Sequence, residues 1–129
     1  MSAKDAEERP AERRTAREVL SDHLRKRKEH QLEADIALNY AEDVVLFTSS
    51  GILRGSAGVR ESAQLLQEQL PEPAYSYSTL LVDGEIGFLE WTAHGERSRV
   101  RDGADSFVIR DGRIIAQTIH YTVEEIPGA

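Results

Sequence analysis

An acidic and an imidazole side chain near the C-terminus are the residues whose spacing indicates chemistry. Asp111-Gly112 is a strong signal for a two-residue hairpin loop. Facing residues share one side of a sheet, and the sides alternate along each strand. Counting outward from the loop therefore places Asp105 and His120 on one face as diagonal neighbours, with main-chain positions about 7–8 Å apart.

This pairing predicts a catalytic proton-transfer couple of Asp105 and His120. Burial in an apolar cavity raises the pKa of a carboxyl, and a nearby imidazolium lowers it. Such a couple can exchange protons near neutral pH. Two alternatives stay open. A buried Asp near a His is as often a structural polar pair, and a one-residue bulge would place the two side chains on opposite faces.

The same alternation of faces along the strands predicts which residues line the cavity. Phe107 and Thr118 share the face of Asp105. In the preceding hairpin, a loop at Asp83-Gly84 directs Trp91 into the cavity. The outward face of that hairpin is expected to carry Tyr75, Tyr77, Leu81, Phe88, Glu90 and His94, with Glu90 and His94 at a dimer surface. Phe47 and Tyr40 complete the predicted ligand-binding set. For Trp91, Phe47 and Tyr40 the alternative is plain core packing.

Three helices and a series of strands must position these residues. Thr15 and Glu18 form a capping box that starts a helix running to about residue 28. His23 is expected at the edge of its apolar stripe without a catalytic role. A second helix is predicted over 32–40, and a third, with Ser56 as N-cap, ends before Pro71. Strands are predicted over 44–48, 52–54, 74–82, 86–94, 104–110 and 113–123, with a polar connection over 95–103. This order is typical of an α+β fold.

Composition excludes several classes of function. The chain has 129 residues, 40% of them hydrophobic, which suits one globular domain. The absence of cysteine excludes disulfides, zinc–thiolate sites and a cysteine nucleophile. Residues 31–129 hold seven arginines and sixteen acidic residues, so nucleic acid is not an expected partner. No apolar run approaches the roughly 20 residues of a membrane helix. We expect a cytoplasmic protein without a cofactor or metal, with residues 1–14 as a disordered lead-in.

Three segments resemble the SnoaL-like group of the nuclear-transport-factor-2-like superfamily. They are NYAEDVVLFTSSGILRGSAGVRE, FLEWTAHG and GADSFVIRDGRIIAQTIHY, and the resemblance spans about residues 15–123. It implies a single domain over 15–125: a cone-shaped curved antiparallel sheet with three helices, all in the N-terminal half, closing a central pocket. It also implies frequent dimerisation through the outer sheet face, and hence a homodimer. Members of the superfamily include isomerases, dehydratases, cyclases, epoxide hydrolases and binding domains, so the resemblance leaves the function open.

The ketosteroid isomerases of this superfamily match poorly at their functional positions. Their general base falls at about Thr48 and their helix-one tyrosine near Leu24, neither of which can serve. Only their oxyanion-hole aspartate has a match, at Asp105. We therefore predict a small-molecule-binding protein that catalyses an acid/base step of isomerase, cyclase or lyase type on a mostly apolar organic substrate. The alternative is a non-enzymatic ligand-binding or dimerisation module.

Overall fold

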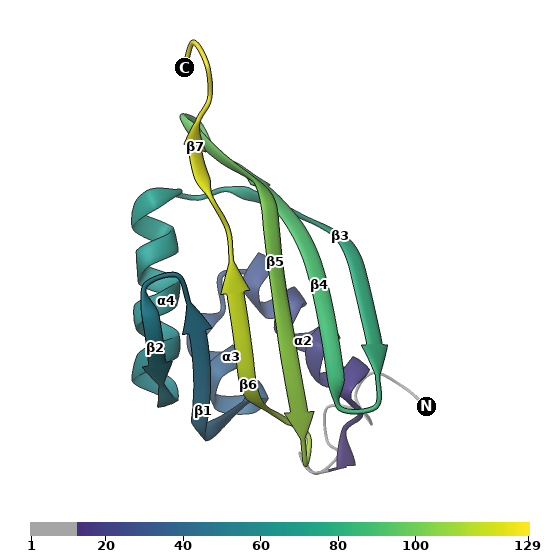
Figure 1. Cartoon of the computed structure of the whole chain (residues 1–129). Coiled ribbons are helices and arrows are strands. Elements are labelled where there is room, and N and C mark those ends of the chain that lie inside the picture. The colour runs from purple at the N-terminus through teal and green to yellow at the C-terminus, as the bar shows by residue number, and fades with distance from the viewer. Residues whose placement is uncertain (1–12) are drawn as a thin grey trace.

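Three helices pack against one face of a curved sheet (Figure 1). The computed structural model describes residues 13–129. The helices are α2 (Ala16–Lys28), α3 (Leu32–Asn39) and α4 (Gly55–Gln69). The strands are β1 (Tyr40–Thr48), β2 (Gly51–Arg54), β3 (Ala74–Asp83), β4 (Ile86–His94), β5 (Ser98–Arg110), β6 (Arg113–His120) and β7 (Val123–Glu125). The predicted lead-in lies outside the described residues, apart from residues 13 and 14.

The sheet is mixed and open. Its order is β2-β1-β6-β5-β4-β3, and β7 pairs with β5. All neighbours are antiparallel except β1 and β6, which are parallel. The expectation of a purely antiparallel sheet is thus corrected at one pair. No tight turn joins β1 to β6, and the long segment between them serves as the crossover that parallel neighbours need.

Helix α2 closes the concave face of the sheet because its apolar stripe packs on the strands. The Thr15 hydroxyl accepts a hydrogen bond from the backbone N–H of Glu18, and the Glu18 carboxylate accepts one from the backbone N–H of Thr15, so the predicted capping box is confirmed. Val19 and Leu20 are fully buried. Leu20 lies against Gly87 of β4, where a Cβ would overlap the leucine side chain. The missing side chain at Gly87 therefore lets the helix approach the sheet closely.

The third helix begins and ends close to the predicted limits. It starts at Gly55 with Arg54 as N-cap, so the assignment of Ser56 as the cap was wrong. Gly55 has a φ of +67°, in the left-handed region that glycine adopts without strain. The chain leaves the helix after Gln69, before Pro71. Strand β5 begins at Ser98, so part of the predicted polar connection over 95–103 is strand instead.

Two β-bulges decide which side chains face the helices. In the β5–β6 hairpin, Ile109 pairs with Ile114 but Val108 pairs with Ala116, which leaves Ile115 as an extra residue. In the β3–β4 hairpin the register shifts between Tyr77 and Thr79, which leaves Ser78 unpaired. Because the faces alternate along a strand, an extra residue transfers every side chain beyond it to the other face.

Candidate functional site

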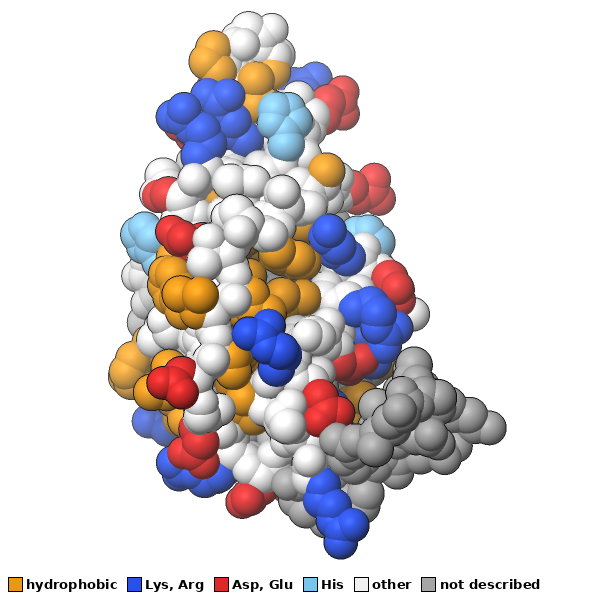
Figure 2. All heavy atoms as spheres, turned by 90° about the vertical axis from the view of Figure 1, so that its right-hand side faces the viewer, with side chains coloured by type: hydrophobic (Ala, Val, Ile, Leu, Met, Phe, Trp, Pro, Cys, Tyr) orange, Lys and Arg blue, Asp and Glu red, His pale blue; other side chains and the backbone are white. Residues whose placement is uncertain are grey.

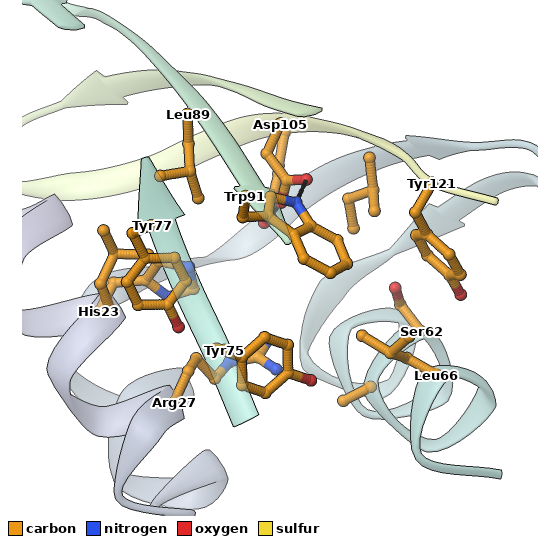
Figure 3. Close-up of a pocket in the computed structure, with 14 residues that line it drawn as sticks. His23, Arg27, Ser62, Leu66, Tyr75, Tyr77, Leu89, Trp91, Asp105 and Tyr121 are labelled. Carbon is orange, nitrogen blue, oxygen red and sulfur yellow. Dashed lines mark hydrogen bonds between the residues drawn. The ribbon is translucent and has the colours of Figure 1, made fainter. Parts of the chain in front are cut away.

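A cavity lies between the concave face of the sheet and helices α2 and α4 (Figure 3). The space open to the centres of water molecules is about 80 Å³, and the whole hollow, including its mouth, is about 560 Å³. A single water needs roughly 10–15 Å³ by the first measure, so several waters or one small ring fit inside. Seen from the β3 side, a strip of hydrophobic side chains runs down the molecule between charged ones (Figure 2).

Asp105 is the buried acid of this cavity. Its side chain comes from β5, and the residue is 8% exposed. The indole Nε1 of Trp91 donates to Asp105 Oδ1 at 3.0 Å, and Nε2 of Gln117 donates to Oδ2 at 2.9 Å. Burial raises the pKa of the Asp105 carboxyl above its ordinary value, and the two hydrogen bonds oppose that rise without cancelling it. Burial thus favours the neutral acid at higher pH than is usual for an aspartate.

A buried tyrosine fixes the amide that holds Asp105. The hydroxyl of Tyr40 donates to Gln117 Oε1 at 2.7 Å. Burial raises the pKa of Tyr40 far above its ordinary value, so this hydroxyl keeps its proton and remains a donor. Since Gln117 Oε1 is an acceptor here, its Nε2 must be the atom that faces Asp105. Gln117 thus links the hydroxyl of Tyr40 to the carboxyl of Asp105.

A second polar group of the cavity comes from α2 and α3. His23 Nδ1 lies 2.8 Å from Asp35 Oδ2, and Arg27 Nε donates to the same oxygen at 2.8 Å. Asn39 Nδ2 donates to the other oxygen at 2.8 Å. Asp35 is completely buried. Burial alone would raise the pKa of Asp35, but the charges of His23 and Arg27 and the three hydrogen bonds hold it below its ordinary value.

The rings of His23 and its neighbours are tightly fitted. The imidazole meets the rings of Tyr40 and Phe107 edge to face, with centroids 5.7 and 5.6 Å away. His23 itself is 4% exposed and lines the cavity. Sequence analysis placed His23 at the edge of an apolar stripe without a role. The missed signal is Asp35, a carboxylate directly before the buried Ile36 in the short α3 helix, where an unpaired charge would be very costly.

Four aromatic rings form much of the remaining wall. Trp91 lies 5.8 Å from Tyr75 and 5.8 Å from Tyr121, and Tyr75 stacks on Tyr77 at 6.2 Å. The indole lies against Gly103 of the neighbouring strand, where a Cβ would overlap it. Tyr75 and Tyr77 were predicted to face outward, which was wrong because the bulge at Ser78 turns them inward. Burial raises the pKa of Tyr77 to about 12.

The predicted couple of Asp105 and His120 is not formed. Asp105 pairs with Ile119 and His120 with Ala104, so the two side chains lie on opposite faces of the sheet. The His120 side chain is 67% exposed, and its Nε2 lies 3.6 Å from Asp102. The bulge at Ile115 is the physical reason, and it was the alternative left open in the sequence. In place of His120, the concave face receives Gln117 and Ile119 from β6.

The predicted lining residues divide between the two faces. Trp91 lies on the cavity wall. Phe107 is on the concave side, but its ring packs against His23 and it is not among the residues that line the cavity. Tyr40 does not line the cavity either, and it contacts the site by its hydrogen bond to Gln117. Thr118 and Phe47 face away from the helices beside each other, and Phe47 is 54% exposed, so neither lines this cavity.

Among residues 13–129 no cluster of three or more His, Asp or Glu side chains has an arrangement that could hold a metal ion. No helix in the same range is long and apolar enough to cross a membrane.

Solved structures with the same fold share little sequence with the chain. An NTF-2-like protein of unknown function from Burkholderia xenovorans LB400 has a TM-score of 0.67 and 19% identity, covering 88% of each chain. AclR, a proposed hydroxylase from Streptomyces galilaeus, has a TM-score of 0.69 and 12% identity, covering 83% of this chain and 88% of AclR. A proposed SnoaL-like polyketide cyclase from Mesorhizobium loti has a TM-score of 0.60 and 18% identity, covering 84% of this chain and all of the cyclase.

No curated protein matches the chain significantly. The model of the SnoaL-like domain family matches residues 22–117, which is most of the chain. This segment includes His23, Asp35, Trp91, Asp105 and Gln117, and the shared fold has the helix-covered curved sheet described above. The chain therefore belongs to the SnoaL-like domain family.

Proposed function

We propose that the chain binds a small, mostly apolar organic molecule in this cavity and catalyses an acid/base step on it, of isomerase, cyclase or lyase type. Asp105 is the proton-transferring group. The observation that carries the proposal is a buried carboxyl with a raised pKa on the wall of a cavity that four aromatic rings help to line. A carboxyl with a raised pKa keeps its proton to higher pH than an exposed aspartate, which makes it better suited to give a proton to a substrate oxygen.

The surroundings of Asp105 support a catalytic role more than a packing role. A purely structural aspartate could be replaced in the fold by an apolar side chain, whereas this one is held by donors from two different strands, Trp91 on β4 and Gln117 on β6. Both donors stabilise the carboxylate that remains after proton donation. The flat wall of Trp91 gives a ring-shaped ligand a stacking surface. The likeness to a proposed polyketide cyclase and a proposed hydroxylase is in keeping with such a ligand.

A thermal-shift screen of small cyclic ketones, phenols and lactones tests the binding part of this proposal. A ligand that binds only the folded protein raises the melting temperature, and at a given concentration a tighter ligand raises it more. We expect hits with the wild type that are lost or weakened in Trp91→Ala. His120→Gln, changed on the outer face, serves as the matched control and should retain every hit. If the screen finds ligands that Trp91→Ala binds equally well, they occupy another site and the proposal fails.

A second proposal concerns the outer face of the sheet, where an apolar surface favours a homodimer. Phe47, Ile52 and Ile86 are 54%, 59% and 62% exposed and surround a shallow hollow that also includes Val45, Val108, Ala116 and Thr118. Exposed apolar surface of this kind is typical of protein–protein contacts. We propose that a second copy covers it. Sedimentation velocity should show a dimer for the wild type and a monomer for Phe47→Glu with Ile52→Glu. A wild type that stays monomeric at high concentration contradicts the dimer.

A further inference from the structure

His23 is a second side chain of the cavity wall that can exchange a proton, and it comes from another part of the fold than Asp105. His23 projects from α2, whereas Asp105 projects from β5, so the two groups come from different layers of the fold and line the same space (Figure 3). His23 and Arg27 are the charged side chains from α2 whose fields reach Asp105. A substrate in the cavity can therefore contact an imidazole and a carboxyl at once.

The hydrogen bonds of Asp35 determine which nitrogen of His23 is available. Asp35 is a fully buried carboxylate that accepts from Arg27 and Asn39, so its contact with His23 Nδ1 requires a proton on that nitrogen. In the neutral imidazole, Nε2 then carries a lone pair. Within residues 13–129, no side chain or backbone group hydrogen-bonds to Nε2, and the two edge-on aromatic rings restrict rotation of the imidazole.

We propose that His23 is a catalytic base of this site, that Asp35 is its positioning residue, and that the substrate is a small ketone with an acidic C–H bond next to its carbonyl. The inference rests on the proposed function, because it uses Asp105 as the acid. An Asp–His pair of this kind holds the imidazole in one tautomer and stabilises the imidazolium that forms during catalysis.

The proton transfers balance as follows. Nε2 of His23 removes the proton from the carbon, and the electron pair of that C–H bond forms a carbon–carbon double bond. The carbonyl π pair moves to the oxygen, which takes the proton of Asp105. The products are a neutral enol, an imidazolium paired with Asp35, and an Asp105 carboxylate held by Trp91 and Gln117. Transfer of the imidazolium proton to the same carbon or to a conjugated one, and of the enol hydroxyl proton to the Asp105 carboxylate, re-forms the carbonyl and restores both groups.

The walls indicate the shape of the ketone. The space open to the centres of water molecules is about 80 Å³ in the whole cavity, so the ketone must be small. Trp91, Tyr75 and Tyr121 offer flat aromatic surfaces, which favour a planar ring next to the enolisable carbon. We use 2-indanone as the probe because its carbonyl lies between two acidic CH₂ groups fused to one ring. Indane, which has the same frame without the oxygen, is the matched control ligand.

Hydrogen–deuterium exchange of 2-indanone in D₂O tests the base directly. Proton NMR should show that the wild-type protein accelerates exchange, and that His23→Gln and Asp105→Asn each lower this acceleration by about 100-fold or more. His120→Gln, altered on the opposite face, should exchange at the wild-type rate. Asp35→Asn should lower the rate by at least about 10-fold while the affinity for 2-indanone changes little, because a positioning residue affects the turnover more than the binding.

Nitrogen-15 NMR of the four histidines of the intact protein provides a measurement that needs no variant to be active. We expect the His23 signal to report a protonated Nδ1 and an unprotonated Nε2, and the Nε2 shift to respond to 2-indanone but not to indane. The opposite tautomer, or an Nε2 that ignores the bound ketone, overturns the inference.

The outcomes separate this inference from the proposed function. If exchange is accelerated and depends on Asp105 but not on His23, the proposed function stands and His23 is not the base. If 2-indanone and indane bind equally and no exchange occurs, the cavity binds ligands but the assignment of the base fails. If neither compound binds and the thermal-shift screen also finds no ligand, the proposed function fails and the inference fails with it.

Discussion

Replacing Asp105 by asparagine tests the central electrostatic claim about the cavity, and the test needs no ligand. Asparagine keeps the size of the side chain but has one acceptor oxygen where the carboxyl has two. Trp91 and Gln117 both donate to this side chain, and the indole N–H can only donate. One buried donor therefore loses its acceptor, which costs about 1–3 kcal/mol of the free energy of unfolding.

The pH dependence of this loss has a defined sign. Folding raises the pKa of Asp105 above its unfolded value of about 3.9, so between the two pKa values the folded protein binds more protons than the unfolded chain. The wild type therefore gains stability as the pH falls through the folded pKa, and the gain is complete below the unfolded pKa. Each pKa unit of the shift corresponds to about 1.4 kcal/mol. Asp105→Asn lacks this gain, so its deficit widens as the pH falls.

Urea unfolding of both proteins, followed by circular dichroism from about pH 8 to about pH 4, measures the difference. All other titrating groups are shared, so they cancel to a first approximation. Asp102→Asn is the opposite control, because hydrogen bonds from the backbone and then the side chain of Thr122 lower the pKa of Asp102. The deficit of that variant should shrink as the pH falls. A deficit of Asp105→Asn that is constant or shrinks toward low pH would refute the claim that burial controls this carboxyl.

Three further predictions follow from named contacts. Asp35→Asn should lower the free energy of unfolding by about 3–5 kcal/mol at neutral pH, because it removes the buried anion that pairs with Arg27; since folding lowers the Asp35 pKa, urea titrations should show the deficit shrinking below about pH 4. Trp91→Phe should cost about 1.5–3 kcal/mol in the same assay, because the carboxyl of Asp105 loses a donor; no loss would show that the indole bond is not formed. Deleting Ile115 should remove the bulge while Ala116 stays opposite Val108, so His120 should remain solvent-exposed and Gln117 should stay in the cavity; an NMR spectrum with His120 buried would contradict this pairing.

Much of the fold was predictable because its signals are local. The capping box at Thr15, the hairpin turn at Asp111 and the proline after α4 each act on the few residues around them. Family resemblance supplied the curved sheet with its helical cover, and the model match and the solved structures confirm it. The parallel pairing of β1 with β6 joins segments far apart in the chain, and no local signal indicates its direction.

The site was less predictable because it depends on single-residue insertions in two strands. On β5 no extra residue lies between the hairpin loop and Asp105, so counting from the loop placed Asp105 correctly on the concave face. His120 lies beyond the bulge at Ile115 and was therefore assigned to the wrong face. Tyr77 shows the same error at Ser78. Nothing in the residue types at either position marks a bulge, since Ile115 and Ser78 are both compatible with regular strand.

The two bulges also account for the chemical character of the cavity. With regular pairing, the concave face would receive Thr118 and His120 from β6 and would lose Gln117, and Tyr75 and Tyr77 would face solvent. The bulge at Ile115 instead brings the amide of Gln117 to the concave face, and the bulge at Ser78 brings the rings of Tyr75 and Tyr77 there. These groups surround Asp105. The carboxyl thereby loses an imidazole partner on its own sheet and is left in an apolar setting that raises its pKa. The imidazole that shares its cavity comes instead from α2, already paired with Asp35, which leaves the acid and the base as separate groups on different layers of the fold.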